Sequence, residues 1–289
     1  MQESARSQEV GVGEERELKH QPIASDAEIV QEANKLIEAS KAFAWVTIIG
    51  QEGSSARHLG SSMLVTSEGR VIGTVGGAIA ELQLIDQAIQ AIKEGKPRTV
   101  KMPLPVCAGV ITCFINVFPP RETLILAGAG HVAQPMATLG KLLGFRIIVV
   151  DDRAEYATKE RFPEADKLIV DDWEKALRDV PIDEHTYVII LTYAGEFDEL
   201  ALRTIIGSKA AYIGMISSES KAKSILGKLR REKISEDLLR RVVTPIGLDI
   251  GAETPAEIAV STMAEIIMRG KKATGKPLSI AEREITKSS

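Results

Sequence analysis

Cysteine, aromatic residues and an excess of charge of either sign are all scarce in this chain. Its two cysteines among 289 residues cannot build a disulfide framework, which favours a reducing cytoplasm. Aromatic side chains make up 4% of the residues, which leaves little for stacking on nucleic-acid bases. Lysine and arginine number 36 against 40 aspartate and glutamate, and the formal net charge of −4 argues against a dedicated nucleic-acid binder.

Long apolar runs are missing as well. No stretch approaches the roughly 20 residues that a membrane-spanning helix needs, and the charged residues after Met1 do not form a secretory signal. Hydrophobic residues (44%) and charged residues (26%) stand in the range of globular proteins, and the length suggests about two domains. We therefore expect a cytoplasmic globular protein with neither membrane nor nucleic-acid partners.

The first part of the chain predicts an arm followed by a small α/β domain. Residues 1–24 carry mixed charge and few core-forming side chains, so we expect a flexible arm. Ser25 and Glu28 form a capping-box pattern at the start of a helix. Strands are expected near 43–49, 63–65, 70–73, 98–102 and 110–118, with a helix over 77–94. The pair Pro119-Pro120 predicts the boundary, which gives a first domain of residues 25–120.

Residues 121–270 alternate short apolar runs with helical segments. Strands are expected at 123–127, 146–150, 167–170, 187–192 and 210–213. Such alternation is typical of a parallel sheet covered by helices on both faces, so we predict a Rossmann-like C-terminal domain. Thr254 and Glu257 form a second capping-box pattern before the last helix, and residues 271–289 are expected to be a polar tail.

A glycine motif follows the first strand of this second domain. Gly128, Gly130 and Ala133 have the G-x-G-x-x-A spacing, and His131 lies inside the same motif. The first glycine allows a tight turn, the second allows close approach of a pyrophosphate, and the alanine allows the helix to pack on the strand. Asp151 ends the next strand, where an acid would hold a ribose 2′-hydroxyl. The alternative is that the glycines only close the turn.

Three loops of the first domain are unusual. Arg57 brings a cation into a Gly/Ser-rich turn that suits a phosphate. Gly76 and Gly77 lead from a strand into a helix that carries Glu81, and they form either an anion-binding turn or merely a tight connection. Cys107 stands in a Pro/Gly loop, where it either ligates a soft metal or packs as an inert thiol.

Signs of catalysis are few. The four histidines are scattered, and the chain has neither a G-x-S-x-G elbow nor a Walker sequence. No Ser-Tyr-Lys or His-Asp arrangement offers the proton donor that a hydride-transfer enzyme needs. The possible acids are Glu81, Asp198, Asp249, Glu257 and Glu265, although charged helix faces usually explain such residues. We therefore expect no turnover by this chain alone.

These motifs, in their order, resemble the XdhC/CoxI family of molybdoenzyme maturation proteins. The resemblance covers roughly residues 27 to 270. It is carried by the segments 53–57, 60–65, 73–81, 107–109, 128–133, 151–153, 161–163, 212–216, 245–251, 254–261 and 264–266. The order of so many segments is far more specific than the glycine motif alone.

The resemblance implies a chaperone that binds the molybdenum cofactor. Such a protein would assist sulfuration of the cofactor and its insertion into a hydroxylase of the xanthine-dehydrogenase or CO-dehydrogenase type, with a cysteine desulfurase as a further partner and a homodimer as its assembly. A nucleotide or dinucleotide in the Rossmann turn is a second ligand to consider. The cofactor-binding candidates are Arg57, Gly76, Gly77, Glu81, Cys107, Gly128, Gly130, His131, Ala133, Asp151 and Asp249.

The cofactor joins a soft metal centre to a hard phosphate, so it suits a thiolate at one end and N–H groups or arginine at the other. Cys107 is the candidate metal ligand, and Arg57, Gly76 and Gly77 are first-domain candidates for the phosphate, provided that their loops converge. Two alternatives remain: an NAD(P)-dependent oxidoreductase, and an accessory subunit that binds no cofactor.

The chain also departs from the family pattern. Alanine stands at 56, 78 and 108 where the family usually has proline, glycine and glycine. Tyr193 stands where a histidine is usual, and Ser217 to Ser220 replace a Gly-Ser-Arg-Arg segment.

Overall fold

The computed structural model describes residues 25–53, 58–76, 78–104 and 109–279. The chain forms two compact units, Met1–Pro120 and Arg121–Ser289. The predicted arm, the end of the predicted tail, and the candidates Arg57, Gly77 and Cys107 lie outside the described residues.

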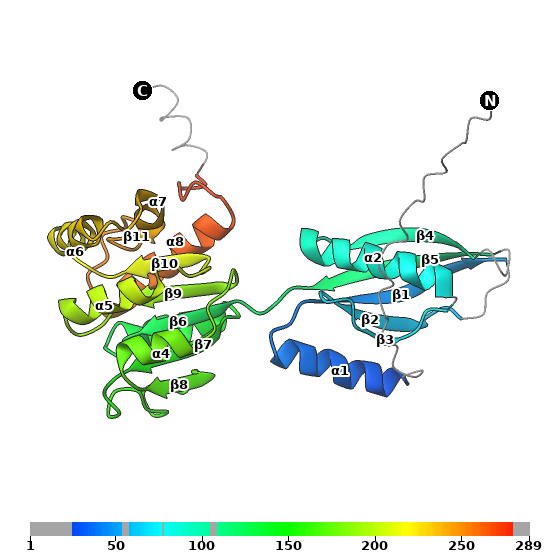
Figure 1. Cartoon of the computed structure of the whole chain (residues 1–289), viewed down its shortest axis with the longest axis horizontal. Helices are drawn as coiled ribbons and strands as arrows, with labels where there is room; N and C mark the ends of the chain where they lie inside the picture. Colours follow the sequence, from blue (N-terminus) through cyan, green and yellow to red (C-terminus); the bar gives the residue numbers. More distant parts are fainter. Residues whose placement is uncertain (1–24, 54–57, 77, 105–108, 280–289) are drawn as a thin grey trace, which may run out of the picture. The chain divides into compact units, whose positions relative to one another are not determined.

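The first unit is an antiparallel sheet with a helix on each face (Figure 1). Its elements are α1 (Asp26–Glu38), β1 (Phe43–Glu52), β2 (Ser62–Thr66), β3 (Val71–Gly73), α2 (Ala78–Glu94), β4 (Arg98–Leu104) and β5 (Gly109–Phe118). The described strands lie in the order β3-β2-β1-β5-β4. Buried side chains of α1 pack against one face and those of α2 against the other, because each helix presents an apolar stripe.

The strand β4 is longer than the sequence predicts. It continues through Pro103, which pairs with Val110, and ends at Leu104. Proline is tolerated in a strand at the edge of a sheet, and β4 is an edge strand. The residues expected to begin a loop therefore extend the sheet.

The second unit is a parallel sheet between two layers of helices. Its elements are β6 (Thr123–Ala127), α3 (Ala133–Leu142), β7 (Arg146–Asp151), β8 (Lys167–Val170), α4 (Trp173–Asp179), β9 (Thr186–Ile190), α5 (Gly195–Ile205), β10 (Tyr212–Met215), α6 (Glu219–Arg231), α7 (Glu236–Arg240), β11 (Val242–Val243) and α8 (Pro255–Gly270). The order β11-β10-β9-β6-β7-β8 is that of a doubly wound Rossmann sheet. This confirms the predicted α/β fold class.

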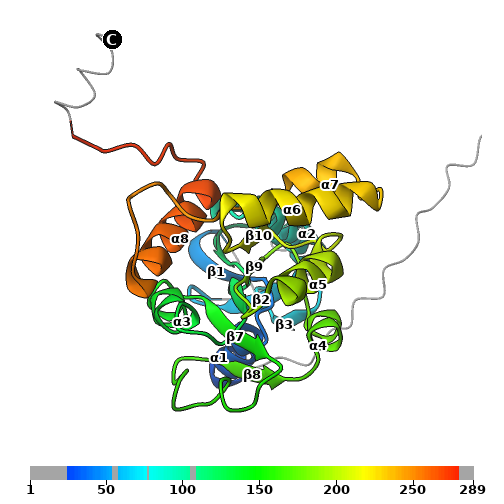
Figure 2. The same cartoon turned by 90° about the vertical axis from the view of Figure 1, so that its left-hand side faces the viewer.

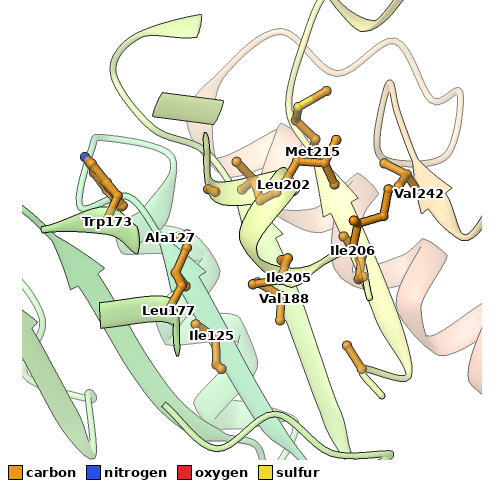
Figure 3. Close-up of a cluster of buried hydrophobic side chains, with 14 of the residues drawn as sticks. Ile125, Ala127, Trp173, Leu177, Val188, Leu202, Ile205, Ile206, Met215 and Val242 are labelled. Atoms are coloured by element: carbon orange, nitrogen blue, oxygen red, sulfur yellow. The ribbon is translucent and has the colours of Figure 1, made fainter. Parts of the chain in front are cut away.

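The two layers of helices explain the two halves of the core. Figure 2 shows α3 and α8 on one side of the sheet, and α4, α5 and α6 on the other. The buried side chains of the second layer meet those of β6, β9 and β10 in the cluster drawn in Figure 3. The sheet is thus fixed on both faces, and the loops at its carboxyl edge are held by rigid elements.

Both capping boxes predicted from the sequence are present, Ser25 with Glu28 before α1 and Thr254 with Glu257 before α8. Within the described ranges, no helix is long and apolar enough to cross a membrane.

A matched pair of leucines tests the core. Leu202 of α5 has no exposed surface, whereas Leu142 at the end of α3 is 81% exposed. We expect Leu202→Ala to lower the free energy of unfolding by about 2–5 kcal/mol, because it leaves a cavity between α5 and the sheet. Leu142→Ala should change it by less than about 0.5 kcal/mol. Urea denaturation of both variants measures this, and equal effects would contradict the packing.

Candidate functional site

Two neighbouring strands of the parallel sheet send their connections to opposite faces. After β6 the chain turns at Gly128 and enters α3, while after β9 it enters α5 on the other face. Because β6 and β9 are paired, their carboxyl ends form the topological switch point of the sheet. Ligands of doubly wound folds bind at this point, which makes it the candidate site of this chain.

Gly128 forms the tight turn that its position in the motif predicts. Its φ is +136°, and its N–H donates to the carbonyl of Val150 at 2.8 Å. A Cβ on Gly128 would lie 2.2 Å from the carbonyl oxygen of Leu191, which follows β9. Only glycine therefore lets the connections after β6 and β9 approach so closely.

Gly130 lies on the open side of the same turn. A Cβ built there would have no atom of the described residues within 4 Å. His131 is exposed beside it, and Ala133 is buried against the sheet, as the motif predicts. The helix α3 starts here, and no side chain in the described part of the chain caps its first N–H groups. This edge is thus the accessible part of the glycine motif.

The side chain of Asp151 is buried against the glycine turn. Its side chain has 0% exposure, Oδ2 accepts the Ala129 N–H at 2.7 Å, and Oδ1 accepts the Arg153 N–H at 3.0 Å. The guanidinium of Arg153 donates to both oxygens, at 2.9 and 3.1 Å. Burial alone would raise the pKa of Asp151, but the hydrogen bonds from Arg153 and Ala129 outweigh it and lower the pKa. The ribose contact that the sequence predicts would require Arg153 to leave.

Arg161 holds the other side of the turn. Its Nη2 donates to the carbonyl of Ala129 at 3.1 Å, and its Nε donates to the carbonyl of Tyr156 at 3.1 Å. The peptide groups on both sides of Ala129 are therefore engaged, one with Asp151 and one with Arg161. The turn is rigid before any ligand is added.

Two tyrosine rings enclose the guanidinium of Arg153. Its Cζ lies 3.8 Å from the ring centre of Tyr156 and 3.9 Å from that of Tyr193. Two rings so close to one carbon atom cannot share a face of the planar group, so one stacks on each face. Tyr193 follows β9, whereas Arg153 and Tyr156 follow β7.

Asp152 is a site residue that the sequence analysis missed. Its Oδ2 accepts the Tyr193 hydroxyl at 3.0 Å. Its Oδ1 is buried without a hydrogen-bond donor among the residues that the structure describes, and it lies 3.8 Å from the Arg153 Nε. The available signal was the pair of consecutive acids at the end of β7, since neighbouring side chains at a strand end point in different directions.

In the first unit, Glu81 occupies the anion-binding turn itself. This buried carboxylate accepts the N–H groups of Val75 at 3.0 Å and Gly76 at 3.3 Å, and also the Thr74 hydroxyl. The Gly76 N–H that we predicted to face a phosphate is thus directed at a negative charge. An incoming phosphate would be repelled from it.

The expected convergence of the three first-unit loops rests on Arg57, Gly77 and Cys107, outside the described residues. The strand ends beside those loops do lie at one end of the sheet. Glu52 pairs with Val110 and Leu104 with Gly109, and the antiparallel order places the end of β3 at the same end.

Three of the other candidate acids form structural contacts, and the fourth is exposed. Asp198 accepts the N–H of Thr192 at 3.0 Å and pairs with Lys221. Glu257 caps α8, and Glu265 accepts the N–H of Gly247 and the hydroxyl of Tyr212. Asp198 and Glu257 thus hold connections at the carboxyl edge of the sheet, whereas Glu265 joins the connection between β11 and α8 to the first residue of β10. Asp249 is exposed between β11 and α8.

No group of three His, Cys, Asp or Glu side chains that could hold a metal ion occurs in the described ranges, from which Cys107 is missing.

Comparison with known families assigns both units of the chain. The model of the XdhC Rossmann domain matches residues 124–266, and that of the XdhC and CoxI family matches residues 36–103. The chain belongs to the XdhC and CoxI family. The resemblance inferred from the order of the motifs is thereby confirmed.

Two curated relatives extend the comparison of this XdhC-family chain. The uncharacterized protein YqeB of Escherichia coli K12 is 35% identical over 257 residues, covering 86% of this chain and 47% of that protein. A Bacillus subtilis protein, named as a probable xanthine dehydrogenase subunit, is 35% identical over 159 residues, covering 55% of this chain and 46% of that protein. The chain thus spans about half the length of the curated relatives it matches.

A solved structure shares the fold. The crystal structure of a xanthine dehydrogenase from Bacillus halodurans aligns with a TM-score of 0.50 at 23% identity, covering 83% of this chain and 96% of that chain. At this identity the likeness concerns the fold alone.

Substitution of the two motif glycines, Gly128 and Gly130, should have different effects on stability. Gly128→Ala should destabilise the fold by at least about 1–3 kcal/mol, because a Cβ at a positive φ is strained and also meets the Leu191 carbonyl. Gly130→Ala should change the free energy of unfolding by less than about 0.5 kcal/mol, because its Cβ enters open space. Denaturant titration compares them, and a harmless Gly128→Ala would contradict the geometry of the turn.

The buried charge of Asp151 predicts a pH dependence. Its pKa is lower in the folded chain than the ordinary value of about 3.9, so the carboxylate stabilises the fold above about pH 4. This contribution is lost as the pH falls through the folded-state pKa. Asp151→Asn should lower the free energy of unfolding by about 2–4 kcal/mol at pH 7, and the difference from wild type should shrink as the pH falls below about 4. Urea titrations between pH 7 and 2.5 test this.

The control for this substitution is Asp249→Asn, which makes the same chemical change at an exposed position. It should alter stability at pH 7 by less than about 0.5 kcal/mol. A gap between wild type and Asp151→Asn that stays constant down to pH 2.5 would show that the charge of Asp151 is not what stabilises the turn.

Proposed function

We propose that this chain binds the molybdenum cofactor and assists its sulfuration and insertion into a hydroxylase of the xanthine-dehydrogenase or CO-dehydrogenase type. The observation that carries the proposal is membership of the XdhC and CoxI family across both units. The name of the Bacillus subtilis relative, which calls it a probable xanthine dehydrogenase subunit, favours such a hydroxylase as the client. A cysteine desulfurase and a second copy of the chain are further proposed partners.

The residues at the carboxyl edge of the Rossmann sheet fit one end of this cofactor. A phosphate would be held by the N–H groups of His131 and Gln134 at the start of α3, where the missing side chain of Gly130 leaves room. The Ala133 N–H already donates to the Gly130 carbonyl, and Pro135 has no N–H. The buried Oδ1 of Asp152 needs a hydrogen-bond donor, which the pterin or a ribose could provide. Asp151 would act indirectly, by holding Ala129 and Arg153 in place.

In this proposal the chain holds the cofactor and presents it to the client enzyme. The molybdenum centre would supply the sulfur and oxygen chemistry that belongs to the client enzyme. Gly128 and Arg161 keep the turn rigid, so that its N–H groups need no rearrangement on binding. Cys107 is proposed as a soft ligand for the metal, and Arg57 as a contact for its anionic groups. No proton transfer by a residue of this chain is part of the proposal, and we expect no turnover of its own.

Substitution of Gly130 tests the proposal. Gly130→Val adds a branched side chain at the proposed phosphate contact, where no described atom stands in its way. The matched control is Gly207→Val, because Gly207 is also open but lies between α5 and β10, at the amino edge of the sheet. We expect Gly130→Val to lower the molybdenum content of protein purified from cells that make the cofactor by about tenfold, equivalent to about 1.4 kcal/mol.

Molybdenum content and the absorbance of the purified protein are the measurements, with unfolding curves to confirm that both variants fold. Equal molybdenum in Gly130→Val and Gly207→Val would mean that the glycine turn is not the cofactor site. Steady hydride transfer from NADH or NADPH that is lost in Gly130→Val would replace the proposal with the oxidoreductase alternative. A wild-type protein without molybdenum or nucleotide would favour the accessory subunit that binds no cofactor.

A further inference from the structure

The side chain of Tyr193 crosses the end of the central strand of the Rossmann sheet. Tyr193 follows β9, and its contacts Asp152 and Arg153 follow β7. The strand β6 lies between β9 and β7, and the glycine turn begins at its end. The phenol therefore spans the end of β6, beside the start of the glycine turn.

The surface under the phenol is a fixed platform. The guanidinium of Arg153 is held in its plane by two hydrogen bonds to the buried Asp151, and Tyr156 stacks on its other face. A guanidinium group held in this way can stack on many kinds of aromatic ring, because the attraction comes from the π face of the ring. The platform would stay in place if the Tyr193 ring left it.

Tyr193 is held by side-chain contacts alone. Its side chain is 49% exposed, its hydroxyl makes one hydrogen bond, to Asp152, and its ring centre lies 4.9 Å from that of Phe197 in α5. The neighbouring backbone is held separately, because Asp198 accepts both the N–H and the hydroxyl of Thr192. Rotation of the Tyr193 side chain alone would uncover Arg153, with no movement of the loop.

Asp152 would then present two acceptors. Its Oδ2 loses the Tyr193 hydroxyl, and its Oδ1 already lacks a hydrogen-bond donor in the described part of the chain. A carboxylate with both oxygens available pairs well with two adjacent donors. The hydroxyl pair of a ribose and the amino and ring N–H groups of a pterin are both of this kind.

We propose that Tyr193 is a placeholder for the planar ring of the ligand. In the bound state a nitrogen heterocycle replaces the phenol on Arg153, two ligand donors occupy Asp152, and Tyr193 turns outward. The inference rests on the proposed function in one respect only, that the ligand binds at this edge of the sheet. The heterocycle belongs either to the nucleoside part of a nucleotide or to the pterin of the molybdenum cofactor.

Binding of two small probes to the full chain tests the inference. AMP represents the nucleotide source and 6-hydroxymethylpterin the pterin source, and calorimetry gives the Kd of each. Tyr193→Ala removes the competing ring and should tighten the preferred probe about fivefold. Asp152→Asn and Arg153→Lys should each weaken it about tenfold, since the first removes an acceptor and the second the planar platform. Leu142→Ala is the exposed control and should bind as wild type does.

The position of Tyr193 provides a second, independent readout. The chain has four tyrosines, so incorporation of fluorotyrosine gives four fluorine NMR signals, and Tyr193→Phe identifies the one that belongs to Tyr193. Saturation with the preferred probe should move this signal toward that of a solvent-exposed tyrosine. A signal that stays in place, or weaker or unchanged probe binding in Tyr193→Ala, would overturn the inference.

The two proposals can fail separately. If neither probe binds to wild type or to Tyr193→Ala, the placeholder is wrong, yet molybdenum that is retained by wild type and lost in Gly130→Val would leave the proposed function standing. Conversely, AMP binding that tightens in Tyr193→Ala, in a protein that never carries molybdenum, would support the placeholder and overturn the proposed function.

Discussion

The buried carboxylate of Asp151 is the contact on which the rest of the site depends. It accepts the Ala129 N–H, which fixes the glycine turn, and three hydrogen bonds from Arg153, which fix the guanidinium. A charge without access to water is stable only with such partners. Because Arg153 is fixed, Tyr156 and Tyr193 stack on it, and Tyr193 meets Asp152. The turn, the arginine and the two tyrosines thus form one unit.

Each half of the chain uses an internal carboxylate at a glycine-rich turn. Turns of this type offer N–H groups to anions. In the first unit Glu81 accepts those of Val75 and Gly76, and in the second Asp151 accepts that of Ala129. A phosphate is therefore repelled where these acids lie. At the start of α3 beside Gly130, no acid in the described part of the chain is bound to the N–H groups, which is why the proposed phosphate contact lies there.

The sequence predicts those features that depend on hydrophobic periodicity and on the backbone freedom of glycine. The alternation of strands and helices indicates the parallel sheet, and the need for glycine at 128 follows from its place after a strand. The function of the acids could not be predicted in this way. Whether Asp151 or Asp152 faces a ligand depends on the direction of two adjacent side chains and on Arg153, which is near in sequence but engages only in the folded chain. Glu81 stands in the first turn of α2 and accepts from residues five to seven positions earlier, a local contact that the spacing allows but does not by itself predict.

Tyrosine at position 193 determines how the contact with Asp152 responds to pH. Burial, followed by the hydrogen bond to Asp152, raises the pKa of the Tyr193 phenol above its ordinary value of about 10. The phenol therefore keeps its proton near neutral pH and remains a donor to Asp152. A histidine would change its charge in that range and would tie the contact to pH. With tyrosine, the hydroxyl stays a donor to Asp152 across the neutral range, so the proposed displacement by a ligand ring needs no change of charge on the side chain of residue 193.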